Sequence, residues 1–405
     1  MQVTILPSVP RGTVQAPSSK SMAHRLLLAA GLSGGESTVR NLAESEDVLA
    51  TLDCLKALGA SVTLSDGTAK ITGCDPKKRT RAVTLPCRES GSTLRFFLPL
   101  CLLSDAPAVL TGSEKLLSRP LSVYETLCRQ RGIFYENNGR AVSVCGTLQG
   151  GAFSLSGSVS SQFVTGLLYA LPLLTADSVI SLVPPVESRS YIDLTLFALH
   201  SFGVRAEWTK ETELTVSGRQ RFLPQDATVE GDWSNAAYLE GLNLVGGNVT
   251  VTGLDEASRQ GDRVYRELFA RLQRGTPRID LSDCPDLGPA LFALSAAQNG
   301  ATFTGVGRLR GKESDRVAAM REELRKFGVK TVETESTLTV FPGLVPPKTA
   351  LSGHNDHRIV MALSLLLTKT GGTIDGAEAV NKSFPDFFER FQKLGTEVRY
   401  AVDQR

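Results

Sequence analysis

The sequence has few of the features that point to disulfide, metal or membrane chemistry. Its seven cysteines form no C-x-x-C pair, so we expect neither a disulfide framework nor a zinc site, and we expect a reducing compartment. The longest apolar run, residues 163–176, is interrupted by Gly166 and Pro172. It is too short for a bilayer span, which needs about 20 residues. The chain is therefore expected to lie outside the membrane.

An excess of charge of either sign is also lacking. The 44 basic residues face 42 acidic ones, for a net charge of +2. This balance argues against a general nucleic-acid or membrane surface and directs attention to local basic clusters. No basic and apolar leader precedes the first structured segment, so we expect a cytoplasmic protein. A Walker loop, a G-x-G-x-x-G fingerprint and a nucleophile elbow are absent from the sequence as well.

A weak internal repeat is present instead. Six times a polar helical pattern ends in a glycine and passes into an alternating strand pattern. These glycines, 53 to 73 residues apart, are Gly59, Gly132, Gly203, Gly275, Gly328 and Gly395. Glycine just past a helix is the usual left-handed stop. Each unit also contains a second, more apolar helix, which favours compact α/β subdomains with the apolar helices buried.

The apolar helices share a small or polar first turn. Such residues cap backbone N–H groups, and capping alone would explain each one. A helix N-terminus also attracts anions, and several of these entrances carry a nearby cation. In "SSKSMAHR", Lys20 stands in the first turn, and Ser21 and Arg25 share a face; "ESGSTLR" and "NDHR" are built alike. The sequence therefore predicts a site for a highly anionic ligand set.

Further charge clusters lie between these helices. Arg119 precedes Pro120, which is expected as a first helical residue, and Lys312 and Arg316 are expected on one helix face. His354 and His357 are three residues apart, but no third ligand is suggested nearby, so no metal site is expected.

Nine motifs in register resemble the 5-enolpyruvylshikimate-3-phosphate synthase family. They are "SSKSMAHR", "ESGSTLR", "SRP", "SSQF", "ESRSYID", "CPDLGPA", "GKESDR", "NDHR" and "NKSFPDFF". The resemblance covers the whole chain and implies an α/β fold of two domains, each of three βαβαββ repeats, in a six-fold inside-out α/β barrel. The domains would be residues 1–14 plus 230–405 and residues 15–229, with the active site in the cleft between them.

The resemblance implies a reaction between shikimate 3-phosphate and phosphoenolpyruvate, without metal or organic cofactor, in a monomer. Asp286, Glu313 and Lys20 would be catalytic. The shikimate 3-phosphate ligands would be Lys20, Ser21, Arg25, Ser160, Ser161, Gln162, Ser188, Tyr191, Asp286 and Lys312. The phosphoenolpyruvate ligands would be Lys20, Gly91, Arg119, Gln162, Arg316, His357, Arg358 and Lys382. Arginine suits both ligands because it binds carboxylate and phosphate in a bidentate way.

One motif departs from the family pattern. Many relatives begin it with Asn-x-Gly, whereas Glu89 stands first here and Gly91 is retained. A carboxylate beside an anionic substrate is costly unless it points away or pairs with a cation, for which Arg88 or Arg119 is available. The retained Gly91 predicts that glyphosate competes with phosphoenolpyruvate.

Three alternatives stay open on the sequence alone. An enolpyruvyl transferase for a UDP-sugar would share the fold, but it usually carries a reactive cysteine that the stretch before Arg119 lacks. A catalytically dead binding protein would not need the full set of charged residues. An RNA-end-processing enzyme of similar repeat architecture would need an obvious nucleotide-binding site and a more basic surface than this balanced composition suggests.

Overall fold

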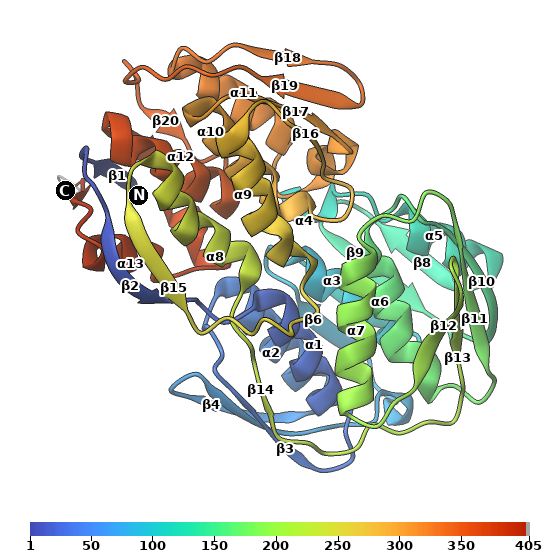
Figure 1. Cartoon of the computed structure of the whole chain (residues 1–405). Coiled ribbons are helices and arrows are strands. Elements are labelled where there is room, and N and C mark those ends of the chain that lie inside the picture. The colour runs from blue at the N-terminus through green and yellow to red at the C-terminus, as the bar shows by residue number, and fades with distance from the viewer. Residues whose placement is uncertain (402–405) are drawn as a thin grey trace. The chain divides into compact units, whose positions relative to one another are not determined.

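The computed structural model describes residues 1–401, and the chain divides into two compact units. The central unit is Lys20–Glu230. The terminal unit combines Met1–Ser19 with the chain from Gly231 onward, so it carries both ends of the chain. Figure 1 shows each unit as an assembly of small sheets and helices.

The central unit contains three four-stranded sheets of one design. In each, a parallel pair of strands is extended by two antiparallel neighbours. The first sheet, in spatial order, is β14 (Ala227–Thr228), β3 (Glu36–Arg40), β5 (Thr68–Thr72) and β4 (Ser61–Ser65). The second is β6 (Val83–Pro86), β7 (Ala108–Thr111), β9 (Ala141–Cys145) and β8 (Phe134–Asn137). The third is β10 (Gly151–Ser156), β11 (Ser178–Val183), β13 (Glu213–Val216) and β12 (Ala206–Lys210).

The terminal unit repeats this design twice and shortens it once. One sheet is β16 (Arg278–Asp280), β17 (Ala301–Thr304), β19 (Thr337–Val340) and β18 (Thr331–Glu333). Another is β20 (Leu351–Ser352), β21 (Gly372–Asp375), β1 (Gln2–Ile5) and β22 (Val398–Tyr400). The third is a parallel pair, β15 (Asn248–Thr252) and β2 (Arg11–Gln15). The six related α/β units expected from the repeat are confirmed, one of them without its hairpin.

The apolar helices form where their patterns predict them. In the central unit they are α1 (Lys20–Gly31), α3 (Gly91–Cys101) and α6 (Ser161–Ala170); in the terminal unit they are α8 (Trp233–Glu240), α10 (Gly288–Ala297) and α12 (His357–Thr370). The other helices are α2 (Glu46–Leu58), α4 (Glu114–Leu117), α5 (Ser122–Gln130), α7 (Arg189–Ser201), α9 (Tyr265–Arg274), α11 (Arg316–Lys326) and α13 (Phe387–Lys393). Among the described residues, none of these helices is long and apolar enough to span a bilayer.

The glycine stops agree with the expectation at five of six positions. Gly59, Gly132, Gly203, Gly328 and Gly395 all have positive φ. The left-handed stop predicted at Gly275 is wrong, because its φ is 170°, which is extended backbone that any residue adopts. From Gly275 the chain enters β16, the parallel strand of the following sheet, without an intervening hairpin. This missing hairpin explains why the spacing between Gly275 and Gly328, 53 residues, is the shortest between successive glycines of the repeat.

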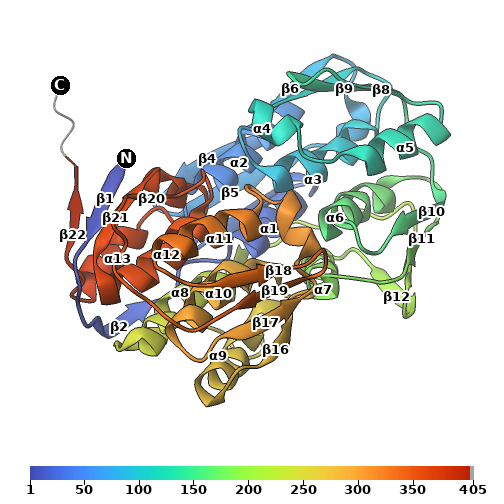
Figure 2. The ribbon, with the colours of Figure 1, turned by 90° about the horizontal axis from the view of Figure 1, so that it is seen from above.

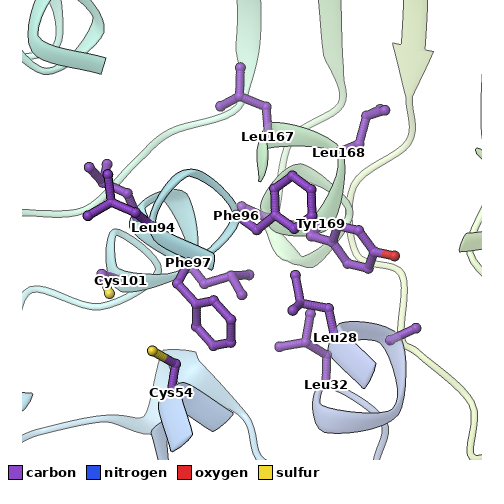
Figure 3. Close-up of a cluster of buried hydrophobic side chains, with 14 of the residues drawn as sticks. Leu28, Leu32, Cys54, Leu94, Phe96, Phe97, Cys101, Leu167, Leu168 and Tyr169 are labelled. Carbon is purple, nitrogen blue, oxygen red and sulfur yellow. The ribbon is translucent and has the colours of Figure 1, made fainter. Parts of the chain in front are cut away.

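Each unit has its own hydrophobic core, built on its apolar helices. In the central unit α3 packs against α6, and α1 packs against α2 and α7. Figure 3 shows Phe96 and Phe97 of α3 meeting side chains of α1 and α6. In the terminal unit α10, α11 and α12 pack side by side, as Figure 2 shows. The polar first turns of these buried helices are consequently fixed by dense packing behind them.

Candidate functional site

The central unit gathers the predicted residues of its α1, α3 and α6 entrances. Arg25 is 3% exposed and is held on three sides. Its Nε donates to Thr195 Oγ1 at 2.9 Å, its Nη2 to the Tyr191 carbonyl at 2.9 Å, and its Nη1 to the Ser21 carbonyl at 2.7 Å. Burial lowers the pKa of Arg25 to about 10, so the guanidinium stays charged at neutral pH. The expectation that Ser21 and Arg25 share a helix face is confirmed.

Lys20 lies at the first residue of α1 and pairs with a carboxylate that the sequence did not single out. Its Nζ lies 2.8 Å from Asp47 Oδ2 on α2, and the two side chains are 14% and 9% exposed. The partial burial makes this ion pair less subject to solvent screening than a surface pair. Asp47 therefore fixes the position of the ammonium group.

The entrances of α3 and α6 are joined by hydrogen bonds. Gln162 accepts from Arg95 Nη1 at 2.6 Å and donates to Ser92 Oγ at 2.9 Å. Ser160 is the N-cap of α6, with Ser161 as the first helical residue. Three of the predicted ligands, Ser160, Ser161 and Gln162, are thus brought to one entrance. Arg95 and Ser92 complete the group, although they were not among the predicted ligands.

Gly91 opens α3 beside Arg119. A Cβ built on Gly91 would lie 2.5 Å from Arg119 Nη1, so only glycine allows the guanidinium this approach. The helix after Arg119 begins at Ser122, so the prediction of Pro120 as a first helical residue is wrong. Arg88, one of the two partners considered for Glu89, pairs with Glu46 at 2.5 Å and Asp53 at 2.7 Å.

Ser188 and Tyr191 belong to the start of α7. Ser188 has a φ of 53° and is buried, and Tyr191 offers its backbone carbonyl to Arg25. A left-handed serine at a helix entrance is uncommon, and such strain often occurs at binding sites. The predicted residues of the central unit thus lie at the entrances of α1, α3, α6 and α7. Lys20 and Arg25 belong to α1, Arg95 belongs to α3, and Arg119 lies beside Gly91.

The terminal unit gathers its predicted residues around Asp286. Three cations contact this carboxylate: Arg316 Nη1 at 2.8 Å, Arg358 Nη2 at 3.2 Å and Lys312 Nζ at 3.3 Å. Asp286 lies in a short 3-10 turn that leads into α10. The three cations come from the ends of α11 and α12 and from the loop before α11. Segments far apart in the chain thus meet at one carboxylate.

Arg316 is the centre of this cluster and is 1% exposed. It also contacts Glu313 Oε2 at 2.8 Å and, through Nε, Asp356 Oδ2 at 2.9 Å. Burial by itself would lower the pKa of Arg316. The carboxylates of Asp356, Glu313 and Asp286 outweigh burial and raise this pKa well above its ordinary value, and Asp356 is fully buried. Asp356 belongs to the "NDHR" motif at the α12 entrance, but it was not predicted as the partner of Arg316.

Lys312 does not lie on a helix with Arg316, so that prediction is wrong. Asp315 is the N-cap of α11, accepting from the Val317 and Ala318 backbone, and the helix therefore begins at Arg316. Lys312 reaches Asp286 from the preceding loop. Burial lowers the pKa of Lys312 to about 8, while the Asp286 carboxylate opposes the shift.

The remaining predicted residues lie at the same end of the terminal unit. His357 and Arg358 are the first residues of α12, both buried, with Asp356 as their N-cap. Lys382 donates to the Asn355 carbonyl at 2.8 Å, which places it beside that entrance. His354 points elsewhere, to Glu323 at 2.9 Å.

Glu322, Glu323 and His354 place three potential metal ligands within 4.8 Å of one another. Glu323 already accepts from Lys326 at 3.0 Å and from the Ser352 backbone at 3.0 Å. The Lys326 ammonium at the Glu323 carboxylate would repel a metal cation bound at the same place. Glu323 and His354 are therefore explained as a hydrogen-bonded support for the loop before α12.

Comparison with known proteins relates the whole chain to one enzyme group. Residues 7–391 match the family model described as EPSP synthase (3-phosphoshikimate 1-carboxyvinyltransferase). The chain is 37% identical to the 3-phosphoshikimate 1-carboxyvinyltransferase of Clostridium kluyveri, with 98% of each chain covered. It is 37% identical to that of Clostridium novyi, with 97% of each covered.

Solved structures agree with the fold. The EPSP synthase of Acinetobacter baumannii superposes with a TM-score of 0.79 at 24% identity, covering 98% of this chain and 100% of that one. The enolpyruvyl transferase NikO of Streptomyces tendae superposes with a TM-score of 0.77 at 13% identity, covering 99% and 98%. The six α/β units are thus those of the enolpyruvyl transferase fold.

Proposed function

Since the chain belongs to the EPSP synthase (3-phosphoshikimate 1-carboxyvinyltransferase) family, we propose that it joins shikimate 3-phosphate to phosphoenolpyruvate. The products are 5-enolpyruvylshikimate 3-phosphate and inorganic phosphate. This is a step of the shikimate pathway, which leads to aromatic amino acids. The observation that carries the proposal at residue level is the convergence of Lys312, Arg316 and Arg358 on Asp286.

The proposed reaction is an addition followed by an elimination. The 5-hydroxyl oxygen attacks C2 of phosphoenolpyruvate, Asp286 takes the hydroxyl proton, and Glu313 gives a proton to C3, which becomes a methyl group. Glu313 then removes a proton from that methyl group, the double bond re-forms and the C–O bond to phosphate breaks. Lys20 stabilises the departing phosphate. Two carboxylates in different environments suit such paired proton transfers.

Each substrate would be bound by ligands from both units. Shikimate 3-phosphate would contact Ser21, Arg25, Ser160, Ser161, Gln162, Ser188 and Tyr191 of the central unit and Asp286 and Lys312 of the terminal unit. Phosphoenolpyruvate would contact Lys20, Gly91, Arg119 and Gln162 of the central unit and Arg316, His357, Arg358 and Lys382 of the terminal unit. Both sets are rich in cations, as two phosphorylated carboxylic acids require. We propose that the two units close around the substrates, because ligands from both must meet.

The decisive experiment measures phosphate release with each substrate omitted in turn. Release should need both substrates, and replacing shikimate 3-phosphate by a UDP-sugar should abolish it. Release without shikimate 3-phosphate, or release that needs the UDP-sugar, would overturn the proposal. Asp286→Ala and Glu313→Ala should each reduce turnover by about 10²–10⁴-fold, the usual contribution of acid–base groups. Near-normal turnover would remove those two roles.

We also propose that the enzyme works as a cytoplasmic monomer. All seven cysteines are free thiols, and five of them are buried, which suits a reducing compartment. Sedimentation at micromolar concentration should give the mass of one 43.4 kDa chain. A species of twice that mass would contradict the monomer.

A further inference from the structure

A chain of buried hydrogen bonds crosses the central unit and has no role in the proposed chemistry. It links His24 of α1, Thr51 of α2, Thr93 of α3 and Ser90, the N-cap of α3. His24 Nδ1 lies 2.7 Å from Thr51 Oγ1, which lies 2.9 Å from Thr93 Oγ1, which lies 2.8 Å from Ser90 Oγ. All four residues are at most 1% exposed. The chain therefore runs entirely in the protein interior.

The geometry at Ser90 gives this chain one direction. Ser90 Oγ accepts the Thr93 backbone N–H at 3.2 Å, as an N-cap does, and it also accepts the Thr93 hydroxyl. A hydroxyl has a single proton, so Thr93 must accept from Thr51, and Thr51 must accept from His24. His24 Nδ1 is then the donor. The imidazole carries its proton on Nδ1 rather than Nε2.

The surroundings of His24 keep it neutral. Its Nε2 is buried and has no hydrogen-bond partner among the described residues, so a proton there would lack an acceptor. The ring stands edge-on to Phe96, with 6.2 Å between the ring centroids. Burial lowers the pKa of His24 well below its usual value, and the positive charges of Lys20 and Arg25 lower it further. The Lys20 ammonium is in turn paired with Asp47 of α2.

The chain joins two entrances of the proposed site. His24 lies one turn after Lys20 on α1, and Thr51 lies one turn after Asp47 on α2, so the two helices share two polar bridges. At the far end, Ser90 directly precedes Gly91, the first residue of α3. A displacement of His24 would therefore reach both the Lys20 ammonium and the Gly91 backbone.

We propose that His24, as the neutral Nδ1–H tautomer, is a positioning residue that holds the Gly91 entrance in register with Lys20. The role assigned to these two entrances rests on the proposed function, in which both bind phosphoenolpyruvate. The tautomer itself follows from hydrogen-bond geometry alone. His24 would not touch a substrate and acts through Thr51, Thr93 and Ser90.

The tautomer is tested by ¹⁵N NMR on protein labelled at its four histidines. His24→Gln assigns the His24 signals by their disappearance. We expect a protonated Nδ1, a bare Nε2 and no titration between pH 8 and pH 5.5, whereas an ordinary histidine titrates near 6.5. A proton on Nε2, or titration at the ordinary pH, would overturn the proposal.

The positioning role is tested with Thr51, which lies in the middle of the series of hydrogen bonds from His24 to Ser90. Thr51→Val keeps the shape of the side chain and removes the hydroxyl, and Thr51→Ser restores it. We expect Thr51→Val to raise the KM for phosphoenolpyruvate about tenfold, which corresponds to the loss of one hydrogen bond. The KM for shikimate 3-phosphate should change less, and Thr51→Ser should behave like the parent. Equal changes in both KM values, in step with lost stability, would show a merely structural role.

These outcomes are separable from failure of the proposed function. If the parent protein releases no phosphate, the proposed function fails while the NMR result still decides the tautomer. If the parent is active and Thr51→Val leaves the KM for phosphoenolpyruvate unchanged, the positioning role alone fails.

Discussion

Replacing the buried Asp356 by asparagine would test whether the cation cluster of the terminal unit is held from behind. Asp356 is fully buried and accepts Arg316 Nε at 2.9 Å, Arg316 Nη2 at 3.3 Å and the Ser314 hydroxyl at 3.0 Å. It also caps α12 by accepting the Arg358 backbone N–H at 3.0 Å. Asparagine retains an oxygen for the cap but removes the charge. The NH2 group of the asparagine would also place a hydrogen-bond donor next to the Arg316 guanidinium, which needs an acceptor there.

The expected loss of stability follows from these contacts. Breaking a buried ion pair by removing one partner costs about 3–5 kcal/mol. Arg316 keeps Asp286 and Glu313, so we expect the lower end for Asp356→Asn, about 3 kcal/mol, or roughly 100-fold in the folding equilibrium. Asp356→Ala also loses the cap, which adds about 1 kcal/mol.

The assay is urea unfolding followed by tryptophan fluorescence. The chain has two tryptophans, and Trp233 is buried in the terminal unit, so a Trp208→Phe background makes the signal specific to that unit. The matched control is Glu397→Ala, which removes an exposed partner of Arg399 in the same unit. Exposed pairs contribute about 0–1 kcal/mol. If Asp356→Asn costs no more than this control, Asp356 does not hold Arg316 and the reasoning fails.

Two further predictions concern binding. With its pKa lowered to about 8, Lys312 loses its charge as the pH rises from 7 to 9, so the KM for shikimate 3-phosphate should increase over this range. Lys312→Arg should make this increase in KM smaller. If KM increases as steeply in the variant as in the parent, Lys312 is not the group that causes it. Gly91→Ala should displace Arg119 and raise the KM for phosphoenolpyruvate, because the new Cβ would lie 2.5 Å from its Nη1. Gly307→Ala, which meets no atom within 4 Å, is the control and should leave both KM values unchanged.

The repeat and the helix entrances could be predicted from the sequence because their causes are local. Apolar periodicity and glycine stops act within one element, and five of the six stops have the expected backbone. The exception, Gly275, shows the limit of this reasoning. A glycine after a helix predicts a left-handed stop, but the path taken at Gly275 depends on β16 joining the next sheet.

The partners of the charged residues could not be predicted because they depend on packing. Asp47 faces Lys20 only because α2 packs on α1, and Asp356 faces Arg316 across 40 residues of chain. Lys312 was expected on a helix face with Arg316 on spacing alone. Spacing says nothing about Asp315, whose cap starts the helix after Lys312. The competition between a cap and helix continuation is decided by local hydrogen bonds.

The charges of the terminal cluster balance within the unit, so the cluster contributes to function through its geometry more than through a net charge. Three cations face three carboxylates: Lys312, Arg316, Arg358, Asp286, Glu313 and Asp356. A balanced buried network adds little net stability, because desolvation offsets much of the attraction. Its value is geometric, since Asp286, Glu313 and Asp356 together hold the Arg316 guanidinium before any substrate binds. Substituting one carboxylate should therefore affect binding by misplacing the cations more than by changing the total charge. Asp356→Asn is the cleanest case, because Asp356 lies behind Arg316 and is proposed to touch neither substrate.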